Sequence, residues 1–227
     1  MKTTTRHIAF TLVELLTVMA IIGILMGLIL TGVQSALYSS RRASARASTH
    51  NIAHAIRAYS LDYGNYPAVA TPTGPEDSRM IVVGESAGLA TESNAGLFNA
   101  LRAIPVGMNV DHKLNPRRQT YFTGPTAKSS KPPRGGFADG TIFPPELVGC
   151  FIDPWGGQYC IVMDADGDDM LDLGTIYADL NGPGNIVRQN PCVFSLAADG
   201  IRGARGYEGL SQKPNGNTPT DDLFSWR

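Results

Sequence analysis

The fold of this chain is decided near its amino terminus by the stretch Phe10-Thr11-Leu12-Val13-Glu14-Leu15-Leu16 and the residues that follow it. Residues 12–30 are almost continuously apolar. About 20 apolar residues in a helix cross the hydrocarbon core of a bilayer. A cleaved secretory signal has a shorter apolar core that is followed soon by a small-residue site, whereas here Arg41 and Arg42 precede the small residues. The stretch therefore predicts a retained membrane helix, with its transmembrane segment at about residues 12–32.

Glu14 is the exception in this apolar segment. A carboxylate inside a membrane helix costs several kcal/mol on insertion scales, roughly 2.5–3.5, and such a residue is a functional-site hypothesis by default. The alternative is that Glu14 lies close enough to the bilayer surface to reach the headgroups, which holds if the helix starts at Met1.

The helix is expected to continue beyond the membrane. No proline precedes Pro67, and no glycine lies between Gly32 and Gly64. Ile52, Ile56, Tyr59 and Tyr63 recur at spacings of 4, 3 and 4, which is one face of an amphipathic helix. Gly64 and Pro67 then supply its stop signal. The pattern predicts that Ile52, Ile56 and Tyr59 of this stripe are buried against strands near residues 158–163 and 193–196, in a small antiparallel sheet formed after about Tyr121.

Composition excludes two classes of protein. The chain is 43% hydrophobic and 17% charged, which argues against disorder of the whole chain. Its net charge of −1 argues against a general nucleic-acid binder, which needs many cationic contacts to phosphate. The charge is unevenly distributed, however, with +5 over residues 1–60 and −6 over the remainder.

The three cysteines, Cys150, Cys160 and Cys192, are too few for a disulfide scaffold and too far apart for a C-x-x-C zinc site. If the C-terminal part is exported, one disulfide and one remaining thiol are compatible with the count, and Cys150 with Cys160 is the better pair. The alternative is three small apolar core residues.

The amino-terminal stretch, a short basic leader that ends in Ala9 and is followed by Phe10, Glu14 and an uninterrupted apolar helix, resembles the class III signal of type IV pilins and type II secretion pseudopilins. The resemblance implies that a prepilin peptidase cuts between Ala9 and Phe10 and N-methylates Phe10. It also implies that Glu14, the fifth mature residue, directs assembly. One departure is Ala9, where the family usually has Gly.

Three further segments, residues 63–67, 153–157 (Asp-Pro-Trp-Gly-Gly) and 193–226, resemble the helix exit, the DPWGNPY turn and the C-terminal loop of the major pseudopilin of type II secretion. The resemblance implies an α+β, type IV pilin-like fold, in which a long N-terminal helix, half transmembrane and half amphipathic, packs on a small antiparallel sheet with a C-terminal loop. The expected divisions are a leader at 1–9, the helix at 10–66, a variable loop-rich region with a short helix (about 94–103) at 67–149, and the sheet and C-terminal loop at 150–227.

Calcium is expected at one of two acidic loops. In the major pseudopilin the loop that matches residues 196–225 binds this cation, and the resemblance assigns its ligands to the Leu196 carbonyl, Asp199, Asp222 and Ser225, with Asp221 as the alternative to Asp222. The second candidate loop offers carboxylates at spacings that suit a hard cation, although it lacks the Gly and the bidentate Glu of an EF-hand. Its candidate ligands are Asp164, Asp166, Asp168 and Asp172, and a solvated hairpin turn is the alternative interpretation.

The resemblance implies a structural subunit, not an enzyme, that forms a homo-oligomeric filament, the periplasmic pseudopilus of a type II secretion system. Its expected partners are other pseudopilins, prepilin peptidase and the inner-membrane assembly platform, and nucleic acid is not among them. We expect a single-pass protein of the bacterial inner membrane with its globular part in the periplasm. One alternative is a subunit of a type IV pilus or DNA-uptake filament. A remote one is a membrane-anchored hydrolase, against which stand the absence of a G-x-S-x-G motif and a single histidine, His112, beyond the first helix.

Overall fold

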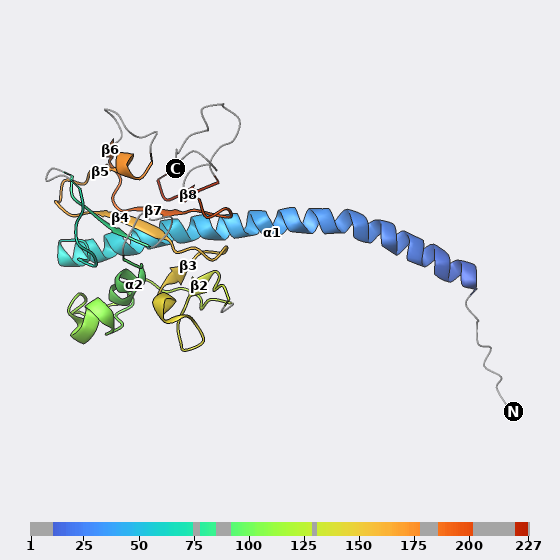
Figure 1. Ribbon diagram of the computed structural model, residues 1–227, viewed down its shortest axis with the longest axis horizontal. Coiled ribbons are helices and arrows are strands. Elements are labelled where there is room, and N and C mark those ends of the chain that lie inside the picture. Colours follow the sequence, from blue (N-terminus) through green and yellow to red (C-terminus); the bar gives the residue numbers. More distant parts are fainter. Residues whose placement is uncertain are drawn as a thin grey trace. The chain divides into compact units, whose positions relative to one another are not determined.

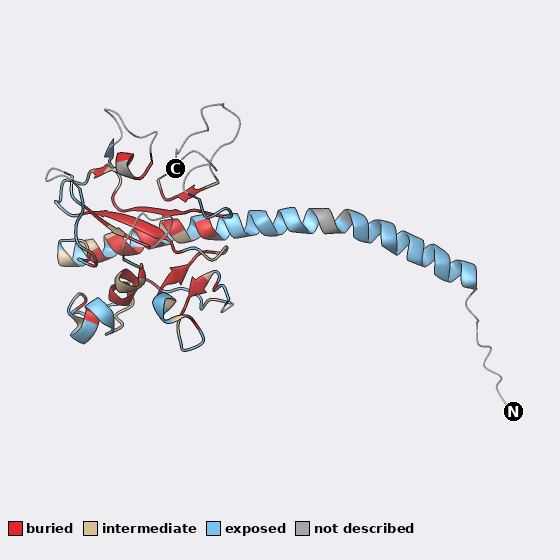
Figure 2. Cartoon of the chain, viewed as in Figure 1, coloured by how far each residue is buried: buried red, intermediate tan, exposed pale blue. Residues whose placement is uncertain are grey.

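The computed structural model describes residues 11–74, 78–84, 92–128, 131–177, 186–201 and 221–226. The chain divides into two compact units, Met1–Arg41 and Arg42–Arg227. In the first unit every described side chain of the helix α1 is exposed (Figure 2). The second unit contains the rest of α1 and all the strands (Figure 1).

Helix α1 runs without interruption from Leu12 to Tyr63 (Figure 1). It ends where Gly64 adopts a φ of +76°, a left-handed conformation that glycine takes without steric cost. The N–H of Gly64 still donates to the carbonyl of Ser60, at 2.8 Å, and closes the last turn. The predicted stop signal at Gly64 is therefore confirmed.

The central sheet is four-stranded and antiparallel, in the order β1-β4-β7-β8. Its strands are β1 (Met80–Val83), β4 (Cys160–Asp164), β7 (Cys192–Ser195) and β8 (Leu223–Phe224). Val82 pairs with Val162, Ile161 with Val193, and Phe194 with Phe224. The expectation that the sheet forms only after Tyr121 is wrong, because β1 lies in the region taken as loop-rich. A four-residue strand between turns has too short an apolar run to stand out from its surroundings.

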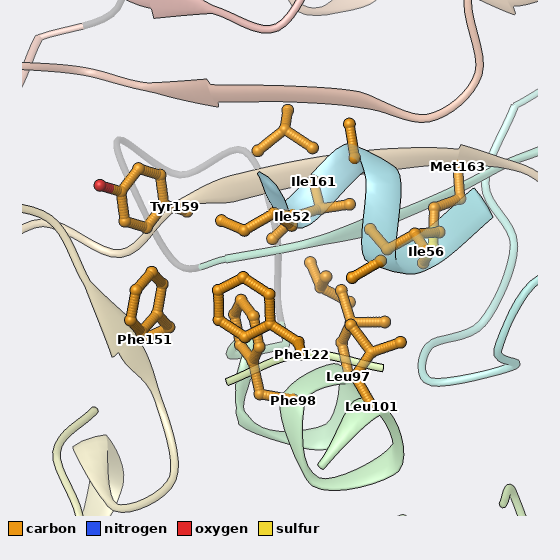
Figure 3. Close-up of a cluster of buried hydrophobic side chains, with 14 of the residues drawn as sticks. Ile52, Ile56, Leu97, Phe98, Leu101, Phe122, Phe151, Tyr159, Ile161 and Met163 are labelled. Carbon is orange, nitrogen blue, oxygen red and sulfur yellow. The ribbon is translucent and has the colours of Figure 1, made fainter. Parts of the chain in front are cut away.

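One face of the sheet packs on α1. Ile52, Ile56 and Tyr59 are buried in one cluster with Ile161, Met163 and Val193 (Figure 3). The predicted stripe and the strands it contacts are confirmed, and so is the α+β, pilin-like fold class. Tyr59 is held further by its hydroxyl, which donates to the carbonyl of Leu114.

The other face of the sheet is covered as well. Cys160, Val162, Phe194 and Phe224 are buried with side chains from the segment 171–177. Because both faces of β4 are covered, all five of its residues are buried. This is why the strand reads as a continuous apolar run in the sequence and shows no alternation.

The remaining elements surround this core. The short helix expected at about residues 94–103 is present as α2 (Ala95–Leu101). The others are η1 (Gly107–His112), β2 (Gly136–Phe137), η2 (Pro145–Leu147), β3 (Phe151–Ile152), β5 (Leu171–Asp172), η3 (Leu173–Thr175) and β6 (Ile186–Val187). Strands β2 and β3 pair with each other, as do β5 and β6.

The cysteines all lie in the described part of the chain, and no disulfide joins any two of them. Cys150 is buried in a small cluster with Ile152, whereas Cys160 and Cys192 belong to the cluster on the outer face of the sheet. The candidate Cys150–Cys160 pair is therefore wrong, and the alternative of three small core residues describes the structure. Burial raises the pKa of the Cys192 thiol to about 12, which keeps it protonated.

Candidate functional site

Glu14 lies in the first turn of α1 and forms a capping box with Thr11. The N–H and the hydroxyl of Thr11 donate to Oε2 of Glu14 at 3.3 and 3.2 Å. In return the N–H of Glu14 donates to Oγ1 of Thr11 at 3.2 Å. This reciprocal arrangement satisfies two backbone donors that a helix start otherwise leaves open. Thr11 is not among the predicted site residues, although the Thr-x-x-Glu spacing is a sequence signal for such a box.

The helix that follows Glu14 is suited to a membrane by length and composition. It contains an 18-residue window with a mean hydropathy of 2.6, none of which is buried. Among the residues that the structure describes, Thr11 is the hydrogen-bond donor to the Glu14 carboxylate. The predicted cleavage and methylation residues, Ala9 and Phe10, lie outside the described residues.

Asp153 organises the Asp-Pro-Trp-Gly-Gly turn. Its Oδ1 accepts from the N–H groups of Trp155, Gly156 and Gly157 at 2.8–2.9 Å. Its Oδ2 accepts from the hydroxyl of Ser195 in β7 at 2.6 Å. Asp153 is only 1% exposed, and this burial raises its pKa. The hydrogen bonds from its four donors lower the pKa, but burial has the larger effect.

Ser195 connects this turn to the C-terminal loop. Its Oγ accepts from the N–H of Ala197, at 3.1 Å, while its hydroxyl donates to Asp153. Ala197 has a φ of +50°, a conformation that few non-glycine residues adopt. The turn and the loop together line a cavity of about 190 Å³ that includes Asp153, Leu196 and Asp199. The two segments quoted separately in the sequence are therefore one structural unit.

The predicted calcium ligands are not all directed to one point. Asp199 caps its own turn, because its Oδ1 accepts from the N–H of Ile201 at 2.9 Å. Asp222 is buried, and its Oδ2 accepts from the hydroxyl of Tyr177 at 2.9 Å. The Oγ of Ser225 accepts from the N–H of Val193 at 3.0 Å.

Asp221 is the carboxylate that faces Asp199. Its Oδ2 accepts from the N–H of Ala198 at 3.2 Å. Burial, and then the charge of Asp199, raise the pKa of Asp221. Two neighbouring carboxylates offer oxygen ligands of the kind that a hard cation such as calcium prefers. The geometry thus favours Asp221, the alternative to Asp222, as the partner of Asp199.

The second acidic loop brings three of its four predicted residues together. Oxygens of Asp164, Asp166 and Asp168 lie within 4.8 Å of one another. Asp164 is buried and accepts from the N–H groups of Asp166, Gly167 and Asp169, so it also closes the hairpin turn. Burial raises the pKa of Asp164, and a hydrogen bond to Asp164 lowers the pKa of Asp166. Asp172 accepts instead from the N–H of Gly174, at the start of η3.

Comparison with known proteins identifies one segment. Residues 5–30 match the model of the prokaryotic N-terminal methylation motif. No curated protein and no solved structure matches the chain. The matched segment contains Ala9, Phe10 and Glu14 and passes directly into the apolar part of α1. It is the class III prepilin signal, and it supports a type IV pilin-like protein with a single membrane anchor.

Proposed function

We propose that this protein is a pseudopilin, a structural subunit that is stored in the inner membrane and assembles into the periplasmic pseudopilus of a type II secretion system. One observation carries the proposal: the methylation motif at residues 5–30 continues directly into an apolar helix, with Glu14 in its first turn. The subunit has no catalytic role in this proposal. It acts by assembling, in contact with prepilin peptidase, other pseudopilins and the assembly platform.

The proposed assembly step uses the charge of Glu14. Cleavage before Phe10 creates a new amine, and the Glu14 carboxylate of one subunit pairs with the amine of its neighbour. An unpaired charge in a low-dielectric helix bundle is costly, and a paired one is tolerated. The preferred axial register between subunits is the one that brings these groups together. Thr11 contacts Glu14 through its own N–H and hydroxyl, so the capping box and the proposed pairing are separable by mutation of Thr11.

A subunit of a type IV pilus or DNA-uptake filament is the second candidate, since both kinds of protein carry the same signal. The unit formed by the Asp153 turn and the C-terminal loop favours secretion, because both segments resemble the major pseudopilin. We also propose that the C-terminal loop holds calcium at Asp199 and Asp221. The cation would supply a cross-link between two glycine-rich segments of the loop.

The test compares Glu14→Ala with Thr11→Ala in the full chain. If Glu14 sets the register, Glu14→Ala leaves membrane insertion and leader cleavage intact but abolishes filaments and secretion. Thr11→Ala removes the capping box, keeps the carboxylate and still assembles. If both variants lose filaments and secretion to the same extent, Glu14 acts only as a helix cap. Normal filaments and secretion with Glu14→Ala would remove the mechanism.

Mass spectrometry of the membrane-extracted protein tests the processing step. The amino terminus should be methylated Phe10, and an intact Met1 leader on assembled subunits would contradict the proposal. Pull-down of secretion or pilus components with the assembled filament distinguishes the two candidate systems.

A further inference from the structure

Charge is strongly segregated along this chain. Between Glu14 and Asp62 there is no acidic residue, and Arg41, Arg42, Arg46 and Arg57 all lie in this interval. Between Arg134 and Arg188 there is no basic residue, and nine acidic residues lie there. Five of these nine occur in residues 164–172, from the end of β4 to β5.

The turn between β4 and β5, here called the acidic loop, comprises Asp166–Asp169 and is exposed. The cavity beside it, about 750 Å³, is lined by Ser60 and Gly64 of the α1 end and by Asp164, Asp166 and Asp169. The acidic loop therefore lies level with residues 60–64 of α1. Arg57 also lines this cavity, but its Nε donates to the carbonyl of Asn190.

The ion pairs of the described residues do not use this loop. They join Arg102 to Asp139 and Arg117 to Asp62. Asp168 accepts from the N–H of Met170 through Oδ1 and forms no ion pair with any residue that the structure describes. Arg42 is equally exposed and has no ion pair within the described part of the chain.

The distance along α1 prevents these two groups from meeting within one chain. Arg42 and Ser60 are 18 residues apart, which is about 27 Å at the helical rise of ~1.5 Å per residue. A second copy shifted along the helix axis by this distance would bring its acidic loop level with Arg42. A contact between two different patches that also shifts each copy along the axis cannot close into a ring, and it generates an open filament.

We propose that the acidic loop of one copy docks on Arg42 of a second copy that is shifted by about 27 Å along the axis of α1. The inference rests on the proposed filament and names a contact within it. Charge complementarity indicates a second copy as the partner, because the acidic loop is negative and the Arg42 surface of the same chain is positive. The contact is additional to the pairing of Glu14 with the neighbouring amine and lies in the globular units.

Charge reversal in the full chain tests the contact. Arg42→Asp and Asp168→Arg should each reduce the number of filaments, and the two substitutions together should restore it. Glu146→Arg is the matched control, because Glu146 is exposed and acidic but lies outside the acidic loop, and it should leave assembly unchanged. Asp168→Asn keeps the acceptor for Met170 and removes only the charge, so a smaller loss is expected. Accumulation and leader cleavage report that each variant folds and inserts.

Crosslinking locates the contact. Two chains are co-expressed, one with Arg42→Cys and the other with Asp168→Cys, and treated with a short bis-maleimide. The native cysteines are fully buried and should not compete. A crosslinked dimer is expected, and none with Glu146→Cys in place of Asp168→Cys.

Two results overturn the proposed contact but not the proposed function: single reversals that leave the number of filaments unchanged, or a double reversal that does not restore the filaments lost in the single ones. If Arg42→Asp reduces the number of filaments and Asp168→Arg does not, the proposal is also wrong. Arg42 would then contact another surface, such as anionic headgroups. If the unmodified chain forms no filaments, the proposed function fails and this contact fails with it.

Discussion

Replacement of Asp153 by alanine should be one of the most destabilising single substitutions outside the hydrophobic core. The carboxylate accepts three backbone N–H groups and one hydroxyl, all within 2.9 Å, and it is 1% exposed. A buried donor that loses its partner costs about 1–3 kcal/mol. Because Trp155, Gly156 and Gly157 are partly reached by solvent, water replaces some of these bonds. We therefore expect a loss of about 3–4 kcal/mol, which is less than the sum of four separate bonds.

The assay is thermal unfolding of the full chain in detergent, followed by near-ultraviolet circular dichroism. A loss of this size corresponds to a fall in Tm of about 10 °C for a protein of this length. Asp153→Asn retains an acceptor at Oδ1 and should lose no more than about 1 kcal/mol. The control is Asp139→Ala, which removes a partly exposed bidentate ion pair with Arg102 and should cost about 1 kcal/mol. A stability of Asp153→Ala within 1 kcal/mol of the unmodified chain would refute the view that this carboxylate holds the turn against β7.

Three further predictions concern the core and the C-terminal loop. Ile56→Ala should lower the free energy of unfolding by about 2–5 kcal/mol because Ile56 is fully buried, whereas Leu61→Ala, at a position that is 86% exposed, should change it by about 0.5 kcal/mol or less. Calcium should raise the Tm of the full chain. Asp199→Ala or Asp221→Asn should remove that increase, and Asp166→Ala should leave most of it. If Asp166→Ala removes the increase and Asp199→Ala does not, the cation binds at the acidic loop. Because the pKa of Asp221 is raised in the folded chain, its ionisation destabilises the fold, a cost that is absent below the unfolded pKa and complete above the folded one. In chelator, Asp221→Asn should therefore stabilise the chain at pH 7 but not below about pH 3, and a stabilisation that is equal at both pH values would contradict this assignment.

The long helix, its end and its buried face were predictable because their signals are local. An uninterrupted apolar stretch next to Glu14 is long enough for a helix that spans a membrane, and this can be read from neighbouring residues alone. The spacing of Ile52, Ile56 and Tyr59 needs only helical geometry to define a face, and that face is buried. Gly64 is a stop signal because glycine alone adopts its left-handed conformation without steric cost.

The C-terminal site depended on contacts between segments that are distant in sequence. Asp153 and Ser195 are 42 residues apart, and only the pairing of β4 with β7 and of β7 with β8 brings the turn and the loop together. Asp221 and Asp222 are adjacent and chemically identical, so no pattern distinguishes them. In the structure Asp222 accepts from the hydroxyl of Tyr177 and Asp221 accepts from the N–H of Ala198, which favours Asp221 in the calcium proposal.

The sequence by itself thus determined the membrane helix, its continuation as a packing face, and the processing signal at residues 5–30, because each depends on the chemistry and spacing of neighbouring residues. The tertiary structure alone decided the edge strand β1, the burial of the three cysteines as thiols, and which carboxylate faces Asp199. Strands of two to five residues carry little local preference, and their register is set by the side chains that pack across the sheet.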